Sequence, residues 1–447
     1  MPIALIVLAA GQGSRMQSDL PKVLHRVAHA PLLAHALRAG GVLQPDRVVV
    51  VAGHGGEAVE AATRALDPEA VVVRQAEQRG TAHAVAQASA ALEDFSGDAI
   101  ILYGDTPFIR PETLDAMLAA RAEGADVVVL GFEAADPGRY GRLIVQDDRL
   151  ERIVEAKDAT PEELAIRLCN SGVIAADKHL LFELIEQVGA DNAAGEHYLT
   201  DIVALARAAR RAARVVICPE AETLGVNTRA DLARAEAAFQ DRARLDAMAT
   251  GATLTAPETV FFAHDTVIGR DVAIEPNVVF GPGVTVETGA TIRAFSHLEG
   301  CHVSADCVVG PYARLRPGAE LDRGVKIGNF VEVKAAQIHE GAKINHLTYI
   351  GDAEIGARVN VGAGTVTCNY DGVAKHRTTI GADAFIGSDT MLVAPVTIGA
   401  GAMTGSGSVV TDDVPDGALA MGRARQETKP GYAERLQQAF RARKETR

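Results

Sequence analysis

A glycine-rich turn carrying two basic side chains lies near the start of the chain. The segment Leu8-Ala9-Ala10-Gly11-Gln12-Gly13-Ser14-Arg15-Met16 follows an apolar run and precedes Pro21-Lys22. Such a turn lets backbone N–H groups approach phosphate oxygens, and the charges of Arg15 and Lys22 strengthen the attraction. The segment lacks the Gly-Lys-Ser/Thr ending of a P-loop, and Met16 stands where a dinucleotide fingerprint has its third glycine. The sequence therefore predicts a phosphate cradle and weakens both the ATPase and the dinucleotide interpretations.

Two side chains that could bind a cation follow later segments. Tyr103-Gly104-Asp105-Thr106-Pro107 ends an apolar run, and the carboxyl ends of parallel strands are where α/β sheets bind their ligands. Asp105 is a candidate ligand for Mg²⁺, because this ion prefers oxygen atoms. Asp before Thr-Pro is also an ordinary turn former, and Asn227 is also a natural N-cap for the segment that follows it. Neither residue alone identifies a metal site.

A third group of polar residues interrupts an otherwise apolar repeat. His346-Leu347-Thr348-Tyr349 is followed by Asn360 and by an insertion that contains Asn369-Tyr370-Asp371-Gly372 and Lys375. Histidine titrates near neutral pH, so His346 suits proton abstraction, although most of the 13 histidines are expected to be surface or packing residues. Glu332 either orients His346 or is a solvated strand carboxylate.

Alternating aliphatic and Ala-rich segments before about residue 227 are the elements that would position the first two groups. The aliphatic runs cover residues 3–8, 48–52, 71–74, 99–102, 127–131 and 215–218. This alternation predicts a mostly parallel sheet with helices on both faces. From Thr228 to about Met248 the chain has no Gly or Pro, which favours one continuous helix joining two halves. Leu232 and Phe239 would share one face of it, so we expect this helix to pack on a neighbour.

After about residue 251, apolar residues recur every six positions. This period fits neither a plain strand nor a helix, but it fits a solenoid with three flat sides, about 18 residues per coil and the recurring residue pointing inward. A β-sandwich would instead alternate with period two. One-residue slips separate some runs, and an insertion from Gly362 to Thr379 is the expected functional loop. The recurring residues are Ile268, Ile274, Phe280, Val286, Ile292 and Leu298; Val309, Leu315, Leu321, Ile327 and Val333; Ile338, Ile344 and Ile350; Ile355 and Val361; and Ile380, Ile386, Leu392 and Ile398.

The composition is that of an ordinary globular protein. With 447 residues, the chain has room for two to four domains. The net charge of −14 argues against nonspecific nucleic-acid binding, although the tail from Arg423 carries eight basic and three acidic residues. The five cysteines form no CxxC pair, which fits a reducing cytoplasm. The apolar segment 3–10 is too short to span a membrane and has no basic residue before it, so we expect a strand, no signal peptide and no membrane partner.

These motifs together resemble the family of bifunctional N-acetylglucosamine-1-phosphate uridyltransferases and glucosamine-1-phosphate N-acetyltransferases. The turn from Leu8 to Met16 matches the family's LxxGxGxRM motif, with Ser14 where Thr is more usual. The resemblance implies an α/β Rossmann-like nucleotidyltransferase domain followed by a left-handed parallel β-helix of hexapeptide repeats. We expect a uridyltransferase (pyrophosphorylase) domain at 1–227, a helical linker arm at 228–250, and an acetyltransferase domain with a basic C-terminal tail at 251–447.

For the first half, the resemblance implies attack by the phosphate of N-acetylglucosamine 1-phosphate on the α-phosphorus of UTP, with release of pyrophosphate. Asp105 and Asn227 would bind Mg²⁺, and Arg15 and Lys22 would neutralise phosphate charge. The implied uridine and phosphate contacts are Leu8, Ala9, Ala10, Gly11, Lys22, Gln75, Gly80 and Thr81. The implied sugar contacts are Tyr103, Gly104, Gly141, Glu155 and Asn170.

For the second half, the resemblance implies acetyl transfer from acetyl-CoA to glucosamine 1-phosphate, with His346 as the general base. The implied sugar-phosphate contacts are Arg316, Lys334, Tyr349, Asn360 and Lys375. The implied acetyl-CoA contacts are Ala363, Asn369, Tyr370, Ser388, Ser406 and Arg423, with Ser406 where some relatives carry Ala. The basic tail would either cover bound CoA or fray. The resemblance also implies a homotrimer with acetyl sites between subunits.

The expected function is thus a two-site cytoplasmic enzyme that supplies UDP-N-acetylglucosamine for peptidoglycan and lipopolysaccharide precursors, with small molecules as its partners. One alternative is a nucleotidyltransferase with a single activity whose β-helix serves allostery or assembly. His346 and the Asn369-Tyr370 insertion weigh against it, because an inert spacer needs neither. A non-enzymatic trimeric scaffold is a second alternative, against which the phosphate turn, Asp105 and Asn227 weigh.

Overall fold

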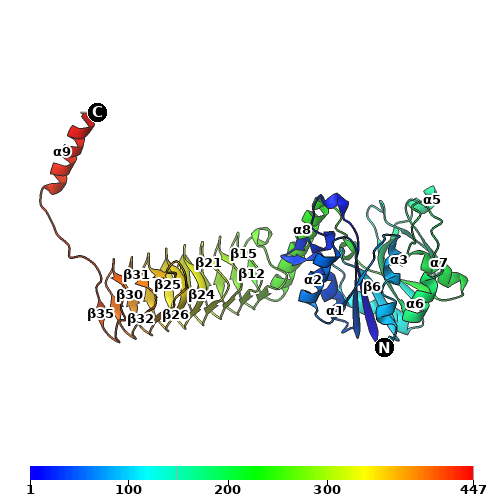
Figure 1. Ribbon diagram of the computed structural model, residues 1–447, viewed down its shortest axis with the longest axis horizontal. Helices are drawn as coiled ribbons and strands as arrows, with labels where there is room; N and C mark the ends of the chain where they lie inside the picture. Colours follow the sequence, from blue (N-terminus) through cyan, green and yellow to red (C-terminus); the bar gives the residue numbers. More distant parts are fainter. Residues whose placement is uncertain (148, 446–447) are drawn as a thin grey trace. The chain divides into compact units, whose positions relative to one another are not determined.

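The computed structural model describes residues 1–147 and 149–445 (Figure 1). Contacts divide the chain into two compact units, Met1–Ala243 and Arg244–Arg447. The division falls inside helix α8 (Arg229–Ala249), which is continuous as the sequence predicts. Among the described residues, no helix combines the length and the apolar character needed to cross a membrane.

A twisted sheet forms the centre of the first unit, in the strand order β11-β7-β10-β6-β1-β4-β5. All six predicted strands are present, and β1 pairs in parallel with both β4 and β6. The sheet is not wholly parallel, because β10, which the sequence did not reveal, runs antiparallel between β6 and β7. The strands are β1 (Ile3–Ala9), β4 (Arg47–Ala52), β5 (Val71–Arg74), β6 (Asp98–Tyr103), β7 (Val127–Glu133), β10 (Leu168–Asp177) and β11 (Ala213–Ile217), with the hairpin β8 (Arg142–Gln146) and β9 (Arg149–Val154) beside β10 and the ribbon β2 (Arg26–Val27) and β3 (Ala30–Pro31) outside the sheet.

Helices cover both faces of this sheet, which explains why its strands are apolar without alternation. Along β1, Leu5 and Val7 pack against helices α1 (Leu32–Gly41), α2 (Gly56–Leu66) and α4 (Pro111–Ala122). Ile6 and Leu8 pack on the opposite face against α3 (Thr81–Ala86), α6 (Lys178–Ile185) and α7 (Asp201–Ala208). Shorter helices complete the unit: η1 (Ser14–Met16), η2 (Lys22–Leu24), η3 (Ala90–Leu92), α5 (Pro161–Leu164) and η4 (Glu220–Thr223).

The first part of α8 packs on the first unit. Phe239 is buried in a separate cluster with Met16 and Phe108, and Leu232 contacts the same cluster. The shared face predicted from Leu232 and Phe239 is therefore the packed face of the helix.

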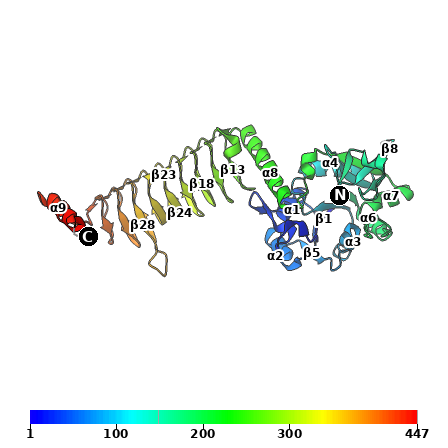
Figure 2. The same cartoon turned by 90° about the horizontal axis from the view of Figure 1, so that it is seen from above.

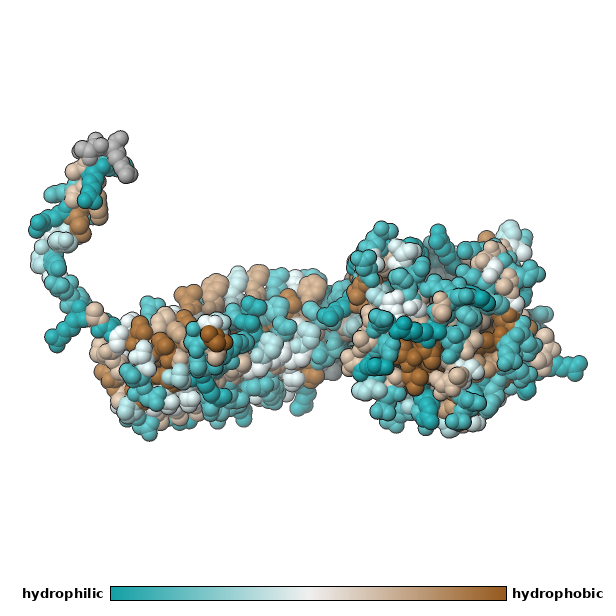
Figure 3. Space-filling view, in the orientation of Figure 1, coloured by the Kyte–Doolittle hydropathy of each residue, from teal (hydrophilic) through white to brown (hydrophobic). Residues whose placement is uncertain are grey.

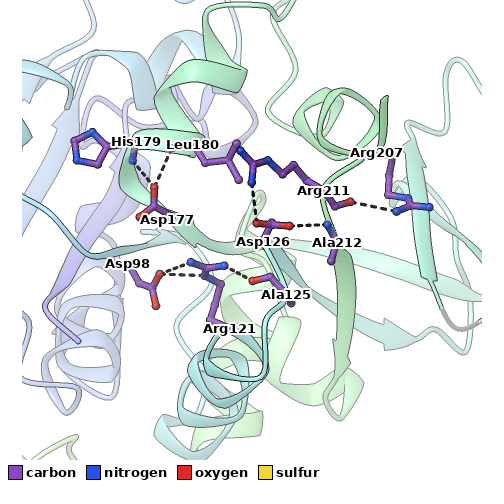
Figure 4. Close-up of polar contacts among 10 residues, drawn as sticks. All are labelled: Asp98, Arg121, Ala125, Asp126, Asp177, His179, Leu180, Arg207, Arg211 and Ala212. Carbon is purple, nitrogen blue, oxygen red and sulfur yellow. Dashed lines mark hydrogen bonds and ion pairs between the residues drawn. The ribbon is translucent and has the colours of Figure 1, made fainter. Parts of the chain in front are cut away.

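Polar contacts tie together the edge of the sheet at which β6 and β7 begin (Figure 4). The Arg121 guanidinium donates two hydrogen bonds to the buried Asp98 carboxylate, at 2.7 and 3.0 Å, and a third to the carbonyl of Ala125. Asp126 accepts a hydrogen bond from the Ala212 N–H at 2.7 Å. These contacts join α4 to the amino ends of β6, β7 and β11.

The second unit is a three-sided prism of parallel β-coils, in agreement with the predicted left-handed β-helix (Figure 2). The first face contains β12 (Thr253–Leu254), β14 (Ala273–Ile274), β17 (Thr291–Ile292), β20 (Val308–Val309), β23 (Lys326–Asn329), β25 (Lys343–His346), β27 (Asn360–Val361), β30 (Phe385–Ile386), β33 (Met403–Thr404) and β35 (Leu419–Ala420). The second contains β13 (Val267–Ile268), β16 (Thr285–Val286), β19 (Cys301–Val303), β22 (Ala319–Leu321), β29 (Thr378–Ile380) and β32 (Val396–Ile398). The third contains β15 (Val279–Phe280), β18 (His297–Leu298), β21 (Arg314–Leu315), β28 (Val366–Cys368), β31 (Met391–Val393) and β34 (Val409–Val410). Strands β24 (Glu332–Ile338) and β26 (Tyr349–Ile355) run from the third face onto the second. The short helix η5 (Pro257–Thr259) follows β12.

The six-residue period marks the core of the prism. Every recurring apolar residue is buried except Ile268, which is partly exposed in the first complete coil. The strand register shows one of these one-residue slips, because Ile268 pairs with Val286 but Val286 pairs with Val303, which is one residue closer in the sequence. The predicted insertion is narrower than expected: β28 and β29 belong to the coil, and the added loop lies between Cys368 and Thr378.

The surface of the prism has apolar areas, including some near its carboxy-terminal end (Figure 3). Val409, Leu419 and Met421 belong to the last coil and are each more than half exposed. After this coil the tail ends in helix α9 (Tyr432–Glu445), whose described side chains are all exposed. Whether the tail covers bound CoA or frays therefore stays a prediction from the sequence.

Candidate active sites

A cavity of about 300 Å³ opens at the carboxyl ends of β1 and β6 in the first unit. Nine of the residues predicted from the sequence line it: Leu8, Ala10, Gly11, Lys22, Gln75, Gly80, Thr81, Tyr103 and Asp105. They come from segments that are far apart in the sequence and meet because parallel strands end at the same edge. The cavity is therefore the place where the first predicted site forms.

The glycine-rich turn is shaped around Lys22. Gly13 has a φ of +61°, and a Cβ atom there would lie 2.6 Å from Cβ of Lys22. A larger residue would therefore be strained and would displace the lysine. Gly53 lies beside the same turn, because a Cβ atom on it would lie 2.6 Å from the carbonyl oxygen of Ala10. Close backbone packing thus fixes both the turn and the lysine that follows it.

Lys22 joins the two predicted metal ligands. Its ammonium group forms an ion pair with the Asp105 carboxylate and donates to Oδ1 of Asn227 at 3.1 Å. Arg15 donates to the same Asn227 oxygen at 3.0 Å. The oxygens of Asp105 and Asn227 therefore already converge on one cationic atom. This donor set fits Mg²⁺, which needs few protein oxygens when phosphates and water complete its shell. The described residues contain no cluster of three or more His, Cys, Asp or Glu side chains suited to a metal.

Tyr103 forms one wall of the cavity and stays protonated. Burial raises the pKa of its hydroxyl group far above the ordinary value, and the charges of Glu155 and Asp105 raise it further. Gly172 has a φ of +92°, and a Cβ atom on it would lie 2.6 Å from the Tyr103 ring. A glycine is thus required where β10 passes the tyrosine.

The other predicted sugar contacts lie around β10. The N–H of Asn170 donates to the Gly141 carbonyl at 2.8 Å, and Oδ1 of Asn170 accepts from the N–H of Gly172 at 3.0 Å. A Cβ atom on Gly141 would lie 3.4 Å from the Glu155 carboxylate. Burial raises the pKa of Glu155, while a hydrogen bond from Thr200 at 3.4 Å opposes the rise.

Two predicted residues, Ala9 and Gly104, are not among the residues that line the cavity. The Ala9 side chain is buried in the core, and the N–H of Gly104 donates to the Leu8 carbonyl at 2.9 Å, which joins β6 to β1. Sequence reasoning missed Val23, Gln78, Ala84 and Glu196, which also line the cavity. Gln78 donates to the Ala10 carbonyl at 2.7 Å, and its place in the polar loop between Gln75 and Gly80 is a signal that could have revealed it. No sequence signal marks Glu196.

In the second unit, several predicted residues lie at one corner of the prism in successive coils. The carbonyl of His346 accepts from the N–H of Gly364 at 3.3 Å, next to Ala363. The carbonyl of Ser388 accepts from the N–H of Gly407 at 2.8 Å, next to Ser406. Arg423 reaches the same corner, because a Cβ atom on Gly407 would lie 3.8 Å from its Cδ. His346, Ala363, Ser388, Ser406 and Arg423 thus form one column, here called the histidine corner.

A basic cluster lies where the third face turns into the second. Lys334 is 3.6 Å from the Asp352 carboxylate. The neighbouring Lys334 lowers the pKa of Lys375, and the charge of Arg316 adds to this effect. Asn369 donates to the Tyr349 hydroxyl at 3.4 Å and also to Asp352. Three basic side chains and two polar ones that were predicted as ligands therefore meet in this cluster, which suits a phosphate group.

The inserted loop is a hairpin held by Asp371, and it projects from the prism near β28 (Figure 2). The Asp371 carboxylate accepts hydrogen bonds from the N–H groups of Val373 and Ala374 and pairs with His376 at 2.7 Å. These contacts hold the pKa of Asp371 well below its usual range. The exposed Tyr370 donates to the Gly372 carbonyl at 2.6 Å, so the turn carries its predicted residues in a defined conformation.

The sequence left two roles open for Glu332, and the structure does not support the one in which it orients His346. Glu332 accepts a hydrogen bond from Arg316 at 2.8 Å and lies 3.7 Å from Arg314, so it belongs to the basic cluster and does not orient the histidine. The partner of His346 is instead Asn329, which the sequence did not single out. Asn360 lies on β27 in register with Lys343, and no described hydrogen bond joins its side chain to either group.

Comparisons with known proteins give different matches for the two halves of the chain. A MobA-like NTP transferase domain matches residues 5–219, and bacterial transferase hexapeptide repeats match residues 265–300 and 377–412. The protein named Bifunctional protein GlmU from Ruegeria sp. (strain TM1040) is 64% identical over 444 residues, covering 99% of both chains. Proteins of the same name from Cereibacter sphaeroides (strain ATCC 17025 / ATH 2.4.3) and Paracoccus denitrificans (strain Pd 1222) are 69% and 66% identical, covering 98% and 99% of this chain and 97% and 99% of their own.

Proposed function

The chain belongs to the family of bifunctional GlmU proteins, and from this we propose how its residues divide the work of two reactions. It is a transferase of UDP-N-acetylglucosamine biosynthesis. It transfers acetyl from acetyl-CoA to glucosamine 1-phosphate, and then transfers uridylyl from UTP to the product with release of pyrophosphate. The observation that carries the assignment is that the two groups of predicted residues lie in separate units, one in the cavity at β1 and β6 and one on the prism.

In the uridylyl step, the chain positions reactants and neutralises charge. The attacking phosphate is already anionic, so no side chain has to deprotonate it. Asp105 and Asn227 would hold Mg²⁺, which supplies positive charge to the phosphates when bound. The Lys22 ammonium, which pairs with Asp105 in this structure, would then bind a phosphate oxygen together with Arg15.

The sugar would bind beside the same cavity. Tyr103 keeps its hydroxyl proton and can donate it to a sugar oxygen. The carboxylate of Glu155 and the amide of Asn170 lie near Gly141, so together they would read the hydroxyl and amide groups of N-acetylglucosamine.

In the acetyl step, His346 would take the proton that the amino group of the sugar loses as its nitrogen attacks the thioester carbonyl. The new C–N bond forms while the C–S bond breaks, and CoA leaves as the thiolate, which is then protonated. Arg316, Lys334 and Lys375 would bind the phosphate of the sugar. The thioester would lie along the histidine corner, with Arg423 available for an anionic group of CoA.

We also propose a homotrimer whose acetyl sites lie between subunits. Phe295, Tyr312, Phe330 and Leu347 occupy equivalent corner positions, all with positive φ and all about half exposed. The rings of Phe295, Tyr312 and Phe330 stack, with centroid distances of 4.9 Å for Phe295 and Tyr312 and 5.2 Å for Tyr312 and Phe330. Left-handed conformations disfavour bulky residues, and an exposed apolar column indicates a covered surface. Because Leu347 follows His346 directly, a second subunit covering this column would also enclose the base.

The cytoplasm, where UTP and acetyl-CoA are made, is the proposed location. The test is to incubate the purified protein with glucosamine 1-phosphate, acetyl-CoA, UTP and Mg²⁺ and to omit each in turn. Free thiol should appear without UTP, whereas pyrophosphate should require prior acetylation or added N-acetylglucosamine 1-phosphate. Pyrophosphate release from glucosamine 1-phosphate at the same rate without acetyl-CoA would contradict the order of the two steps.

A further inference from the structure

Asn329 and His346 lie in adjacent coils and touch through their side chains. The two residues are paired in register between β23 and β25. Oδ1 of Asn329 lies 2.8 Å from Nδ1 of His346. Because an amide oxygen can only accept, this contact places the ring proton on Nδ1 and leaves the lone pair on Nε2.

A second histidine of the prism has the same geometry with a different partner. Nδ1 of His339 lies 2.9 Å from Oδ2 of Asp322, which also stands 17 residues earlier in the chain, and its Nε2 lies 3.4 Å from Glu354. The hydrogen bond with Asp322 raises the pKa of His339, and Glu354 adds to the rise. One coil geometry therefore serves two purposes: a carboxylate favours the charged imidazole, whereas an amide orients the ring without adding a negative charge.

None of the described charged residues around His346 is bonded to its ring, so Asn329 is the residue that can orient it. Among the described residues, no carboxylate lies within 4.0 Å of a ring nitrogen of His346. On β24, Glu332 is engaged by Arg316. Lys343 lies on β25 itself, and Asp389, from a later coil, faces Gly364 at the same corner. The amide is thus the only side chain that the structure shows bonded to the ring in the described part of the chain.

We propose that Asn329 is a positioning residue for acetyl transfer: it fixes the orientation and tautomer of His346, so that the free Nε2 lone pair faces the amino group of the sugar. This inference rests on the proposed role of His346 as the base. On this proposal, Asn329 affects kcat for acetyl transfer, whereas other residues bind the sugar phosphate and acetyl-CoA.

The test is the pH dependence of acetyl transfer by the full-length Asn329→Asp and Asn329→Ala variants. Asn329→Asp keeps the shape but adds a negative charge, which stabilises an imidazolium, so the acid limb of the kcat/KM profile should move up by about one pH unit. Above that limb the Asp variant should regain most of its activity. Asn329→Ala should lower kcat by about 10-fold at every pH, with both KM values changed less than twofold. An unmoved acid limb in the Asp variant, or full kcat in the Ala variant, would overturn the proposal.

A matched control is Gln337→Ala, which removes another side-chain hydrogen bond between adjacent coils, the one donated to Asp322 at 2.9 Å. It should leave the pH profile unchanged, and a shift equal to that of Asn329→Asp would show that the effect is structural. The His346→Ala variant distinguishes failure of the proposed base from failure of the positioning role of Asn329. If it retains acetyl transfer, the proposed base is wrong; if it loses acetyl transfer while the Asn329 variants behave as wild type, only the positioning role fails. Thermal melting of each variant checks that the prism is folded.

Discussion

At the scale of single residues, the first site depends on a cation held between two oxygens. Lys22 occupies the point where the side chains of Asp105 and Asn227 converge. A bound Mg²⁺ would compete for the same oxygens, so the lysine must turn toward the phosphates when the site fills. Removal of the side-chain oxygen of either Asp105 or Asn227 should therefore weaken metal binding.

Asp105→Ala should abolish uridylyl transfer, with a loss of roughly 10³-fold or more, because charge stabilisation at the phosphates is lost. Acetyl transfer should be unchanged, since it occurs in the other unit. The measurement is pyrophosphate release and free thiol release from the same preparation. Asp94→Ala, an exposed carboxylate outside the cavity, is the matched control. Uridylyl transfer at the control rate would remove Asp105 from the site.

Glu155, a predicted sugar contact, should make the free energy of unfolding depend on pH. Its pKa is raised in the folded protein, mainly by burial, so ionisation destabilises the fold as pH rises from the unfolded value through the raised folded value. Glu155→Gln should thus increase the free energy of unfolding at pH 7, and the gain should vanish below about pH 4, where both states are protonated. Urea denaturation at the two pH values measures this, with the exposed Glu162→Gln as control. A gain of the same size at both pH values would contradict the assigned cause.

Residues that act through sequence motifs could be predicted, whereas residues that act through spatial neighbours could not. The turn at Gly11 and Lys22 is a local pattern whose geometry follows from its glycines. Glu196 has no local pattern and becomes a neighbour of the cavity only in the folded unit, and Asn329 becomes a neighbour of His346 only when β23 and β25 pair in register. The sequence left the role of Glu332 open for the same reason, because its position along the chain did not reveal that Arg316 binds its carboxylate.

At the scale of elements, a buried ion pair holds the amino ends of the first sheet. The Asp98 and Arg121 side chains are 3% and 11% exposed, so each would be an unpaired buried charge without the other. Both lie at the edge opposite the carboxyl ends where the cavity opens, so their contribution is to the fold and not to the chemistry (Figure 4).

Arg121→Ala should reduce the free energy of unfolding by about 3–5 kcal/mol, because it leaves the Asp98 carboxylate buried and unpaired. The double variant Asp98→Asn with Arg121→Met should cost less than the single one, since it leaves no buried charge. Denaturant unfolding of the full chain measures both. A double variant less stable than Arg121→Ala would contradict this reason, because the loss of stability would then come from losing the ion pair and not from the unpaired Asp98 carboxylate. Arg139→Ala, at an exposed position, is the control.

Elements with a strong period could be predicted, and elements set by tertiary pairing could not. The six-residue period revealed the prism because each recurring side chain points into one narrow core. Strand β10 was missed because its first half carries Asn170, Ser171 and Gly172, which break the apolar run. The limits of the inserted loop were also too wide, because β28 places Thr367 inside the core where an aliphatic residue was expected.

At the scale of the whole molecule, each unit has its own core and its own candidate site. Fragments 1–243 and 244–447, divided where the contacts divide the chain, should therefore keep uridylyl and acetyl transfer, respectively, within about 10-fold of the full chain. The measurement is kcat/KM for each reaction, with gel filtration to report the assembly of the second fragment. A folded and assembled second fragment without acetyl transfer would contradict the assignment of that activity to the prism.

Because the prism is a stack of similar coils, its length can change without a change in the histidine corner or the basic cluster. Each coil adds one interstrand spacing of about 4.8 Å along the axis, and it repeats the corners of the coil before it. Duplication of one coil upstream of Arg314 would lengthen the unit while leaving the histidine corner and the basic cluster unchanged. The number of coils before Arg314 therefore sets the length of the prism independently of the residues at the histidine corner.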